Sequence, residues 1–248
     1  MSQTILITGG SRGIGRAAAI LAGGRGWSVG VNYAGNEQAA RATVAAVEAA
    51  GGKAVPILGD VAKEADVIAM FDATEKAFGP LSGVVNNAGI VAPGSPLADM
   101  SAERLTRMFN VNVLGAYLVA RETARRLSTD RGGKGGSLVN LSSAAARLGS
   151  PNEYVDYAGS KGAIDTMTVG LSKELGPRGI RVNAIRPGLI DTEIHASGGA
   201  PDRAFRLANM VPLGRPGTAE EVARTILFLL SDESSYINGA IIDVTGGR

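Results

Sequence analysis

The sequence predicts an α/β protein built on one doubly wound parallel sheet with helices on both faces. Short apolar runs alternate with longer helical segments along all 248 residues. The short runs are almost continuous in Ile, Val, Leu and Ala, which is typical of strands buried on both faces of a parallel sheet. Their repeated alternation with helical segments favours a doubly wound sheet.

Seven strands and six main helices are expected, in alternating order. The predicted strands are 4–8, 28–32, 54–58, 83–86, 137–141, 181–185 and 240–244. The predicted helices are 14–25, 37–50, 62–78, 102–127, 155–175 and 219–230. No linker or internal repeat divides the chain, so one domain over 1–248 is expected. A longer segment at about 192–216 follows a late strand, where a lid over a substrate is expected.

Composition excludes several classes of protein. The chain is 45% hydrophobic and 19% charged with a net charge of +2, so it can bury a core and has no strongly basic face for nucleic acid. It has no cysteine and one histidine, His195, so no disulfide, thiolate nucleophile or His-cluster metal site is expected. No apolar run is long enough for a membrane helix, and the first strand leaves no room for a signal peptide. A cytoplasmic enzyme without a metal is the expectation.

Tyr157 and Lys161 are the first candidates for chemistry. Four residues apart on a predicted helix, they face the same side. Free tyrosine has a pKa of about 10, and a nearby ammonium group lowers that pKa by favouring the phenolate. A tyrosine tuned in this way can give or take a proton near neutral pH. Such a pair also arises by chance as a surface contact, so its meaning depends on the rest of the chain.

A glycine-rich loop joins the first predicted strand to the first helix. It reads Thr8-Gly-Gly-Ser-Arg-Gly-Ile-Gly15. Glycines allow a close approach to a ligand, and the helix N-terminus offers free N–H groups to a pyrophosphate. The spacing differs from the G-x-G-x-x-G fingerprint of dinucleotide sites, so the match depends on position between strand and helix.

The end of the second strand predicts which dinucleotide is bound. An acidic residue there would bind a ribose 2′-hydroxyl, and its absence beside an arginine favours a 2′-phosphate. The strand ends at Asn32 and Tyr33, and the first acid is Glu37. Arg12 in the glycine loop can pair with phosphate, and Asn32 can donate hydrogen bonds to it. NADP(H) is therefore the predicted cofactor, with NAD(H) as the alternative.

Taken together, these motifs resemble those of the short-chain dehydrogenase/reductase family, of the classical type, over essentially the whole chain. Bacterial members described as glucose 1-dehydrogenase-like or 3-oxoacyl-carrier-protein reductase-like are the most similar. The matching pieces, in order, are the glycine loop, Asp60-Val61, Asn86-Asn-Ala-Gly89, Asn112, Ser142-Ser143, Tyr157-x-x-x-Lys161 and Pro187-Gly188 with Thr192. The resemblance implies a single-domain Rossmann fold with seven parallel strands in the order 3-2-1-4-5-6-7.

The resemblance also implies roles for individual residues. Tyr157 would be the general acid or base, Lys161 would lower its pKa and hold the nicotinamide ribose, and Ser143 would hydrogen-bond the substrate oxygen. Asn112 would hold a water that links Lys161 to solvent. The residues implied to bind the cofactor are Gly9, Ser11, Arg12, Gly13, Ile14, Gly15, Asn32, Tyr33, Asp60, Val61, Asn87, Ala88, Gly89, Tyr157, Lys161, Pro187, Gly188, Ile190 and Thr192.

One spacing departs from the family pattern. Tyr157 follows Ser143 by 14 residues, one more than is common in the family. A one-residue insertion in the loop before Tyr157 would explain the difference. Side chains alternate at a strand end, so only one of Ser142 and Ser143 can face the cleft, and Ser143 is preferred. His195 and Tyr154 are left open between substrate contact and packing.

The predicted function is interconversion of a carbonyl and a secondary alcohol with NADP(H). The substrate is open among a sugar such as glucose, a 3-oxoacyl thioester and a small ketone. Two alternatives are a non-catalytic dinucleotide-binding regulator and an isomerase or dehydratase on the same fold. The resemblance further implies a homotetramer, or a homodimer, formed through helices 102–127 and 155–175. Nucleic acid and membranes are not expected as partners.

Overall fold

The computed structural model describes residues 3–248. Its main sheet has seven strands in the order β3-β2-β1-β4-β5-β6-β9, and all neighbours are parallel. The predicted order is confirmed, because β9 is the seventh strand of this sheet along the chain. The strands are β1 (Thr4–Ile7), β2 (Ser28–Tyr33), β3 (Lys53–Leu58), β4 (Gly83–Asn86), β5 (Gly136–Leu141), β6 (Ile180–Pro187) and β9 (Ile241–Val244). A separate pair is formed by β7 (Ile190–Asp191) and β8 (Gly217–Thr218).

Five of the six predicted helices are present with small changes at most at their ends, and the sixth, 102–127, is interrupted. The α-helices are α1 (Gly13–Gly24), α2 (Glu37–Ala49), α3 (Glu64–Phe78), α4 (Ala102–Phe109), α5 (Gly115–Leu127), α6 (Ala145–Leu148), α7 (Val155–Leu175), α8 (Ile194–Ser197), α9 (Arg203–Arg206) and α10 (Ala219–Leu230). Single 3₁₀ turns occupy Leu97–Asp99, Thr129–Arg131, Gly176–Arg178, Ala208–Met210 and Asp232–Ser234. Helix α3 begins two residues later than predicted, because the Asp60 carboxylate accepts the Ala62 N–H and makes a turn there.

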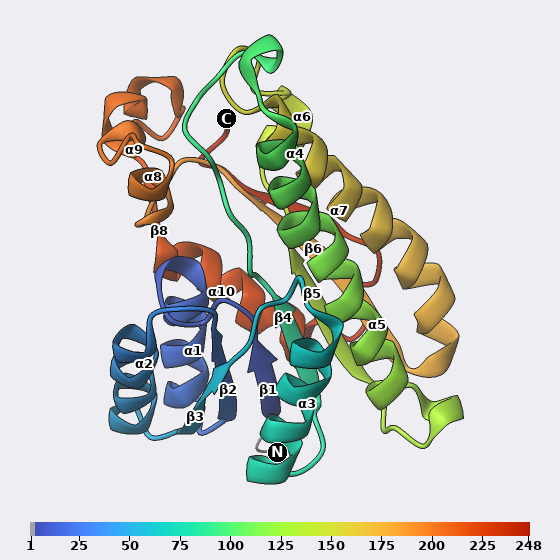
Figure 1. Ribbon diagram of the computed structural model, residues 1–248. Helices are drawn as coiled ribbons and strands as arrows, with labels where there is room; N and C mark the ends of the chain where they lie inside the picture. The colour runs from blue at the N-terminus through green and yellow to red at the C-terminus, as the bar shows by residue number, and fades with distance from the viewer. Residues whose placement is uncertain (1–2) are drawn as a thin grey trace.

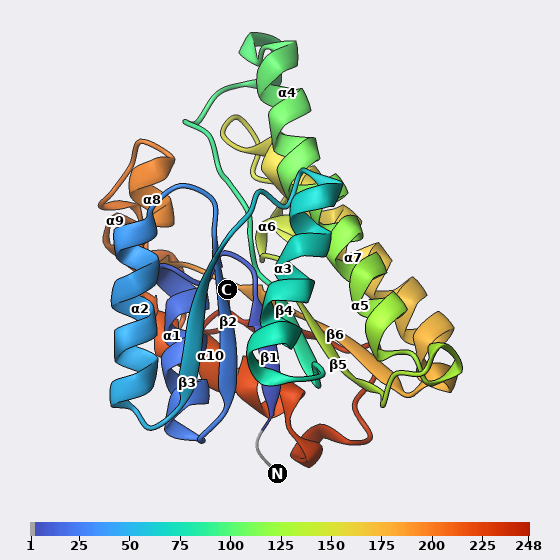
Figure 2. The same ribbon diagram turned by 60° about the horizontal axis from the view of Figure 1, so that its bottom comes forward.

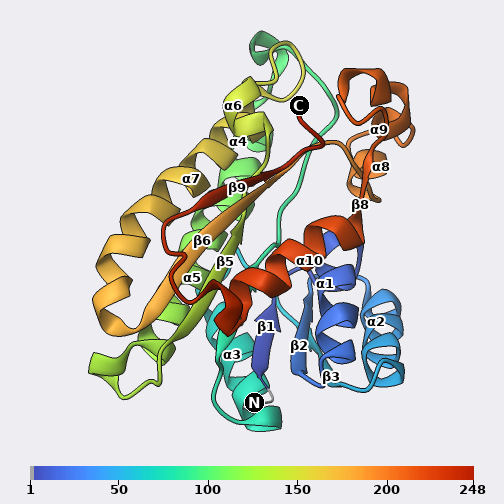
Figure 3. The ribbon, with the colours of Figure 1, turned by 180° about the vertical axis from the view of Figure 1, so that it is seen from behind.

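Helices cover both faces of the sheet and bury an apolar core on each. One core packs α1 and α10 against the strands, and the other packs α3, α5 and α7 against the opposite face. Figure 1 shows the α3, α5 and α7 side, and Figure 3 shows α10 and α1 crossing the other side. Helices α5 and α7 lie side by side in both Figure 1 and Figure 2. The large buried area of a two-sided sheet supplies the main driving force for folding.

The helix predicted over 102–127 is interrupted. Residues Asn110–Leu114 form a π-helical turn between α4 and α5, and the Gly115 N–H donates to the Asn110 carbonyl. A π turn shifts every following side chain around the helix axis, and such turns often occur at functional sites. Asn112 lies inside this turn, so the uninterrupted helix expected from the sequence is wrong at a candidate catalytic position.

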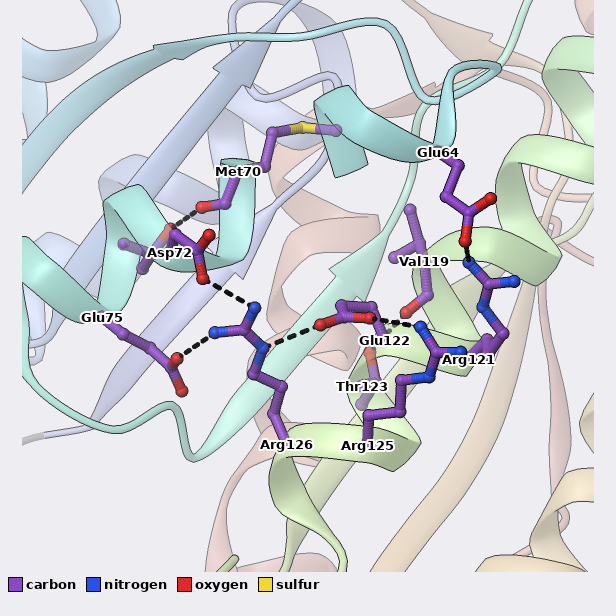
Figure 4. Close-up of polar contacts among 11 residues, drawn as sticks. Glu64, Met70, Asp72, Glu75, Val119, Arg121, Glu122, Thr123, Arg125 and Arg126 are labelled. Atoms are coloured by element: carbon purple, nitrogen blue, oxygen red, sulfur yellow. Dashed lines mark hydrogen bonds and ion pairs between the residues drawn. The ribbon is translucent and has the colours of Figure 1, made fainter. Parts of the chain in front are cut away.

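An ion network joins α3 to α5 (Figure 4). Arg126 donates to Glu75, Asp72 and Glu122 at 2.6, 2.7 and 2.9 Å. Its side chain is 20% exposed, and three carboxylates satisfy its planar donors. None of these four residues lines the cavities described below. The network holds two helices together without taking part in the candidate site.

The segment predicted as a lid, at about 192–216, contains two short helices, α8 and α9, and one 3₁₀ turn. Helices α8 and α9 stand apart from the main layers, beyond the carboxyl ends of the strands (Figure 1). The C-terminus lies between this segment and α6 in both Figure 1 and Figure 3. Within residues 3–248, no helix has the length and apolar character needed to cross a membrane.

Candidate active site

The glycine loop forms a narrow cradle between β1 and α1. Gly9 and Gly13 have φ angles of +62° and +53°, which favour glycine. A Cβ on Gly15 would lie 2.4 Å from the Gly9 carbonyl oxygen, so only glycine fits there. Arg12 precedes α1 and its side chain makes no capping hydrogen bond, which leaves the first-turn N–H groups available to an anion. This geometry fits a dinucleotide pyrophosphate.

Asn32 supports the loop and is not available to a ligand. It is 2% exposed, and its Oδ1 accepts the Gly9 N–H at 3.0 Å. Its Nδ2 donates to the carbonyls of Gly59 and Ile57 at 3.0 and 3.3 Å. These partners argue against the expected role of Asn32 as a hydrogen-bond donor to a 2′-phosphate. The buried amide is used by the protein to connect β2, β3 and the loop.

A cleft of about 430 Å³ runs from the glycine loop across the ends of β2 and β3. Its wall includes Arg12, which is exposed, and Tyr33. On the far side the wall is formed by Asp60 and Val61 and by the segment 87–90. Asn87 is fixed in this wall because its Nδ2 donates to the carbonyls of Thr8 and Gly9. The sequence-predicted residues 9, 11–15, 32–33, 60–61, 87–89 and 192 surround this cleft or its glycine loop.

Tyr157 lines a second cavity and is hydrogen-bonded to Ser143. A hydrogen bond with Ser143 acts to lower the pKa of Tyr157, but burial acts more strongly and raises that pKa above its ordinary value. Ser142 is buried, and its hydroxyl donates to the Lys161 carbonyl at 3.2 Å. The structure therefore turns Ser143, and not Ser142, towards Tyr157. This direction is opposite to the lowering expected from the sequence, because burial disfavours the charged phenolate.

Lys161 is buried beside Tyr157. Its ammonium group donates to the Leu141 carbonyl at 2.7 Å and lies 5.6 Å from the centre of the Tyr157 ring. Burial lowers the pKa of Lys161 to about 8, and the charge of Asp165 opposes that change. Buried lysines change their pKa readily, which suits a group that passes a proton. The two residues on one helix face are thus in contact, as predicted from their spacing.

Asn112 fixes the loop that follows β4. Its Oδ1 accepts the Ile90 N–H at 2.8 Å, and its Nδ2 donates to the Ile90 carbonyl at 2.9 Å and to Ser160 at 3.2 Å. A Cβ on Gly89 would lie 3.4 Å from the Asn112 Oδ1 and 3.6 Å from the Lys161 ammonium nitrogen. The π turn, the β4 loop and Lys161 therefore meet at Gly89. The side chain of Asn112 is fully used in this contact.

The second cavity has a volume of about 390 Å³ and continues into the cofactor cleft. Both share Ile14, Asn87, Gly89, Thr192 and Ile194. Its inner wall carries Tyr157, Lys161 and the segment 187–190. A ligand bound along the glycine loop can therefore reach Tyr157 without leaving the protein.

A tight turn at the cavity mouth precedes Tyr157 in the chain. Gly149, Ser150 and Asn152 have φ angles of +71°, +45° and +62°. The two non-glycine residues are in a sparsely populated region, which holds the loop in a fixed bend after α6. The one-residue insertion expected between Ser143 and Tyr157 stays a prediction.

The outer wall contains residues that the sequence did not single out. Arg203 on α9 donates to both Glu153 oxygens at 2.9 and 2.7 Å and lies 5.0 Å from the centre of the Tyr154 ring. Arg248, the last residue, also lines the cavity. Glu153, Arg203 and Arg248 are 45 to 95 residues apart in the chain, so no local sequence pattern predicts that they meet at one cavity. His195 and Tyr154 both line the cavity, and the His195 Nε2 is 2.8 Å from the Ile190 carbonyl.

Comparisons with known proteins identify the family. Residues 9–248 match a family model described as enoyl-(acyl carrier protein) reductase. The chain is 51% identical over 243 residues to the uncharacterized oxidoreductase YgfF of Escherichia coli, and the match covers 98% of each chain. It is 38% identical to L-rhamnose 1-dehydrogenase (NAD(P)(+)) of a Sphingomonas strain, covering 99% of this chain and 95% of that protein.

Solved structures agree with the sequence relatives. A short-chain type dehydrogenase/reductase from Mycobacterium marinum matches with a TM-score of 0.92 and 34% identity, covering 99% of this chain and 94% of that one. The chain belongs to the short-chain dehydrogenase/reductase family and is an oxidoreductase that acts on CH–OH groups with NAD(P) as acceptor.

Proposed function

We propose that this enzyme interconverts a carbonyl and a secondary alcohol with NADP(H), using Tyr157 as general acid and base. The observation that carries the proposal is that Tyr157, hydrogen-bonded to Ser143, lies beside Lys161 in the wall of a cavity continuous with the cofactor cleft. A proton donor and a second hydrogen-bond donor at one point suit an oxygen that gains negative charge. The nicotinamide supplies or accepts the hydride when the cofactor is bound.

Tyr157, Ser143 and Lys161 have different roles in the proposed proton transfer. In reduction, Tyr157 donates its proton to the developing alkoxide while Ser143 hydrogen-bonds the same oxygen. In oxidation, Tyr157 accepts the hydroxyl proton of the alcohol and must first be a phenolate. The Lys161 cation stabilises that phenolate. Lys161 would also hold the ribose hydroxyls of a bound nicotinamide. Because the Asn112 side chain is committed to Ile90, we assign the relay water to its backbone carbonyl.

The cofactor cleft favours NADP(H) over NAD(H). No acidic residue ends β2, and Arg12 is exposed at the cleft wall. Since Asn32 is committed to the protein, Arg12 is the side chain left to pair with a 2′-phosphate. Replacing Arg12 by Ala is expected to raise the KM for NADPH about 10-fold to 100-fold, the loss of one charge-assisted contact. The KM for NADH should change less than about twofold.

Steady-state kinetics with both cofactors measure this preference. Arg224→Ala removes an exposed arginine from α10 and is the matched control, with both KM values unchanged. Equal effects of Arg12→Ala on NADPH and NADH would show that Arg12 does not read the 2′-phosphate.

The substrate end of the cavity favours a ketone with an apolar body. Its wall includes Val91, Leu148, Pro151, Leu189 and Ile194. Two of the polar groups there already have partners, since Glu153 binds Arg203 and His195 contacts the Ile190 carbonyl. A sugar needs several free hydrogen-bonding partners, and these five apolar side chains offer none. Residues 192–216 are proposed to act as the lid over this end.

A panel experiment tests the function. Purified enzyme is mixed with NADPH or NADH and small ketones, a 3-oxoacyl thioester, or, with NADP, glucose and rhamnose. Loss of NADPH absorbance with an apolar ketone is the expected result. Product formed without a net change in absorbance would instead indicate an isomerase or dehydratase, and no turnover with any compound would contradict the proposal.

We also propose a homotetramer, with a homodimer as the smaller alternative. Phe109, Leu114 and Tyr117 on the α4–α5 side and Val155 and Val169 on α7 are between 38% and 46% exposed. Large apolar side chains on adjacent helices suit burial against a second copy. Light scattering should give about four times the chain mass of 25.3 kDa. A mass near one chain would exclude the assembly.

A further inference from the structure

Arg104 connects three segments beside the catalytic helix. It lies on α4, and its guanidinium donates to both Asp156 oxygens, at 2.8 Å from Nε and 3.2 Å from Nη2. Its third donor, Nη1, reaches the Pro93 carbonyl at 2.6 Å. Helix α4 lies beside α6 and the start of α7 in Figures 1 and 3. One side chain thus joins α4, the loop after β4 and the first turn of α7.

Asp156 is the residue directly before Tyr157. Its side chain is completely buried, and its Oδ1 also accepts the Tyr157 N–H at 2.9 Å. A buried carboxylate destabilises the folded protein unless it is paired with a cation and hydrogen-bonded. Arg104, with 16% of its side chain exposed, supplies the paired charge. Within residues 3–248, this is the one ion pair between α4 and α7.

The loop held at Pro93 belongs to the same constellation. Ile90 in that loop is fixed by Asn112, and Val91 lines the substrate cavity. Asn112 therefore positions the inner part of the loop, and Arg104 positions its outer part relative to α7. The rate of an enzyme falls steeply when a catalytic group is displaced by about 1 Å.

We propose that Arg104 and Asp156 form a positioning pair that holds Tyr157 in register with Ser143 and the β4 loop. The proposal rests on the proposed role of Tyr157 as acid and base. It assigns no contact with substrate or cofactor to either residue. The pair acts through the Tyr157 backbone and the Pro93 carbonyl.

Four variants test the pair by its effect on kcat and KM. Arg104→Met removes both connections, Asp156→Asn keeps an acceptor for the Tyr157 N–H but removes the charge, and the double variant removes both charges. Arg104→Lys keeps the charge but cannot reach both Asp156 oxygens and Pro93 in one geometry. In Arg104→Met, kcat for NADPH-dependent reduction is expected to fall about 10-fold to 100-fold. The KM for NADPH should stay within about twofold.

Coupling between the two residues is the deciding feature. The double variant should lose no more kcat than Arg104→Met alone, and Arg104→Lys should be intermediate. Arg126→Met is the matched control, since Arg126 is similarly buried and paired but lies in the α3–α5 network. It should lower thermal stability and leave kcat unchanged. Additive losses in the double variant, or near-normal kcat in both single variants, would overturn the pair.

Hydrogen exchange tests the placement without any substrate. The amides at the start of α7, including Tyr157, should exchange faster in Arg104→Met and Asp156→Asn than in wild type or Arg126→Met. Unchanged exchange there would overturn the proposal, even if turnover fell. A wild type without turnover on any carbonyl would instead count against the proposed function, and the exchange result would still decide the pair. If Arg104→Met does not fold, Asp156→Asn and Arg104→Lys carry both measurements.

Discussion

Replacing Tyr157 by Phe is expected to lower kcat for carbonyl reduction by a factor of about 10²–10⁴. The ring and its packing remain, but the proton donor for the developing alkoxide is lost. Ser143 still offers its hydrogen bond, so a small residual rate is expected. Cofactor binding, measured by NADPH fluorescence, should change little, because the glycine loop and the cleft wall are untouched. Full activity in this variant would exclude Tyr157 as the acid.

The pH dependence of the same reaction gives an independent measurement. Burial raises the pKa of Tyr157 above its ordinary value, so the hydroxyl keeps its proton at neutral pH. Reduction, which needs the protonated form, should be nearly independent of pH between about 6 and 8. Oxidation, which needs the phenolate, should become faster as pH rises. This slope should disappear in Tyr157→Phe and persist in the control Tyr236→Phe, which alters an exposed residue.

Replacing Lys161 by Met is expected to abolish most turnover and to stabilise the protein at neutral pH. Methionine matches the lysine stem but has no charge, so the phenolate loses its nearby cation. The folded protein, however, no longer has to bury an ammonium group. Burial lowers the pKa of Lys161 from 10.5 to about 8. A difference of this size corresponds to about 3 kcal/mol of destabilisation below pH 8 in the wild type.

The sign of the pH effect distinguishes this cause from repacking. Between pH 8 and pH 10.5 the unfolded chain holds a proton that folded Lys161 has released. The wild type therefore gains stability as pH rises through this window, and Lys161→Met does not. The stability advantage of Lys161→Met should fall by about 3 kcal/mol between pH 7 and pH 10.5. The lost hydrogen bond to the Leu141 carbonyl lowers that advantage.

Chemical denaturation at several pH values, without cofactor, provides the measurement. Lys173→Met removes an exposed lysine from the same helix and serves as the control. Its effect on the free energy of unfolding should be small and should vary little with pH. A pH-independent difference between Lys161→Met and wild type would show that Lys161 is not destabilised by burial.

Most of the fold could be predicted from sequence because its signals are local. Continuous apolar runs identify buried strands, and α7 and α10 have the predicted bounds. The interruption of α4–α5 could not be predicted in this way, because the residues around Asn112 continue a helical pattern. Asn112 contacts the Ile90 backbone across the fold, and this tertiary contact accompanies a local turn that helical propensity does not reveal.

Some residues of the candidate site could likewise be predicted from local sequence, and others could not. Tyr157 and Lys161 are neighbours on one helix, so their spacing alone brought them together. Asn32 was assigned to the cofactor because it ends a strand at the correct edge. Its actual use, between the glycine loop and the carbonyls of β3 and Gly59, depends on segments about 25 residues apart. Polar residue type at a strand end does not say whether the group faces a ligand or the protein.

By itself, the sequence determined the doubly wound sheet, the dinucleotide loop and the Tyr157–Lys161 pair, since each depends on periodicity or spacing within a single element. Only the tertiary structure decided which serine faces Tyr157, which way its pKa moves and which residues close the cavity. Those outcomes depend on burial and on contacts between distant segments, such as Arg104 with Asp156 and Arg203 with Glu153. Desolvation and long-range pairing are properties of the packed chain, and no local pattern encodes them.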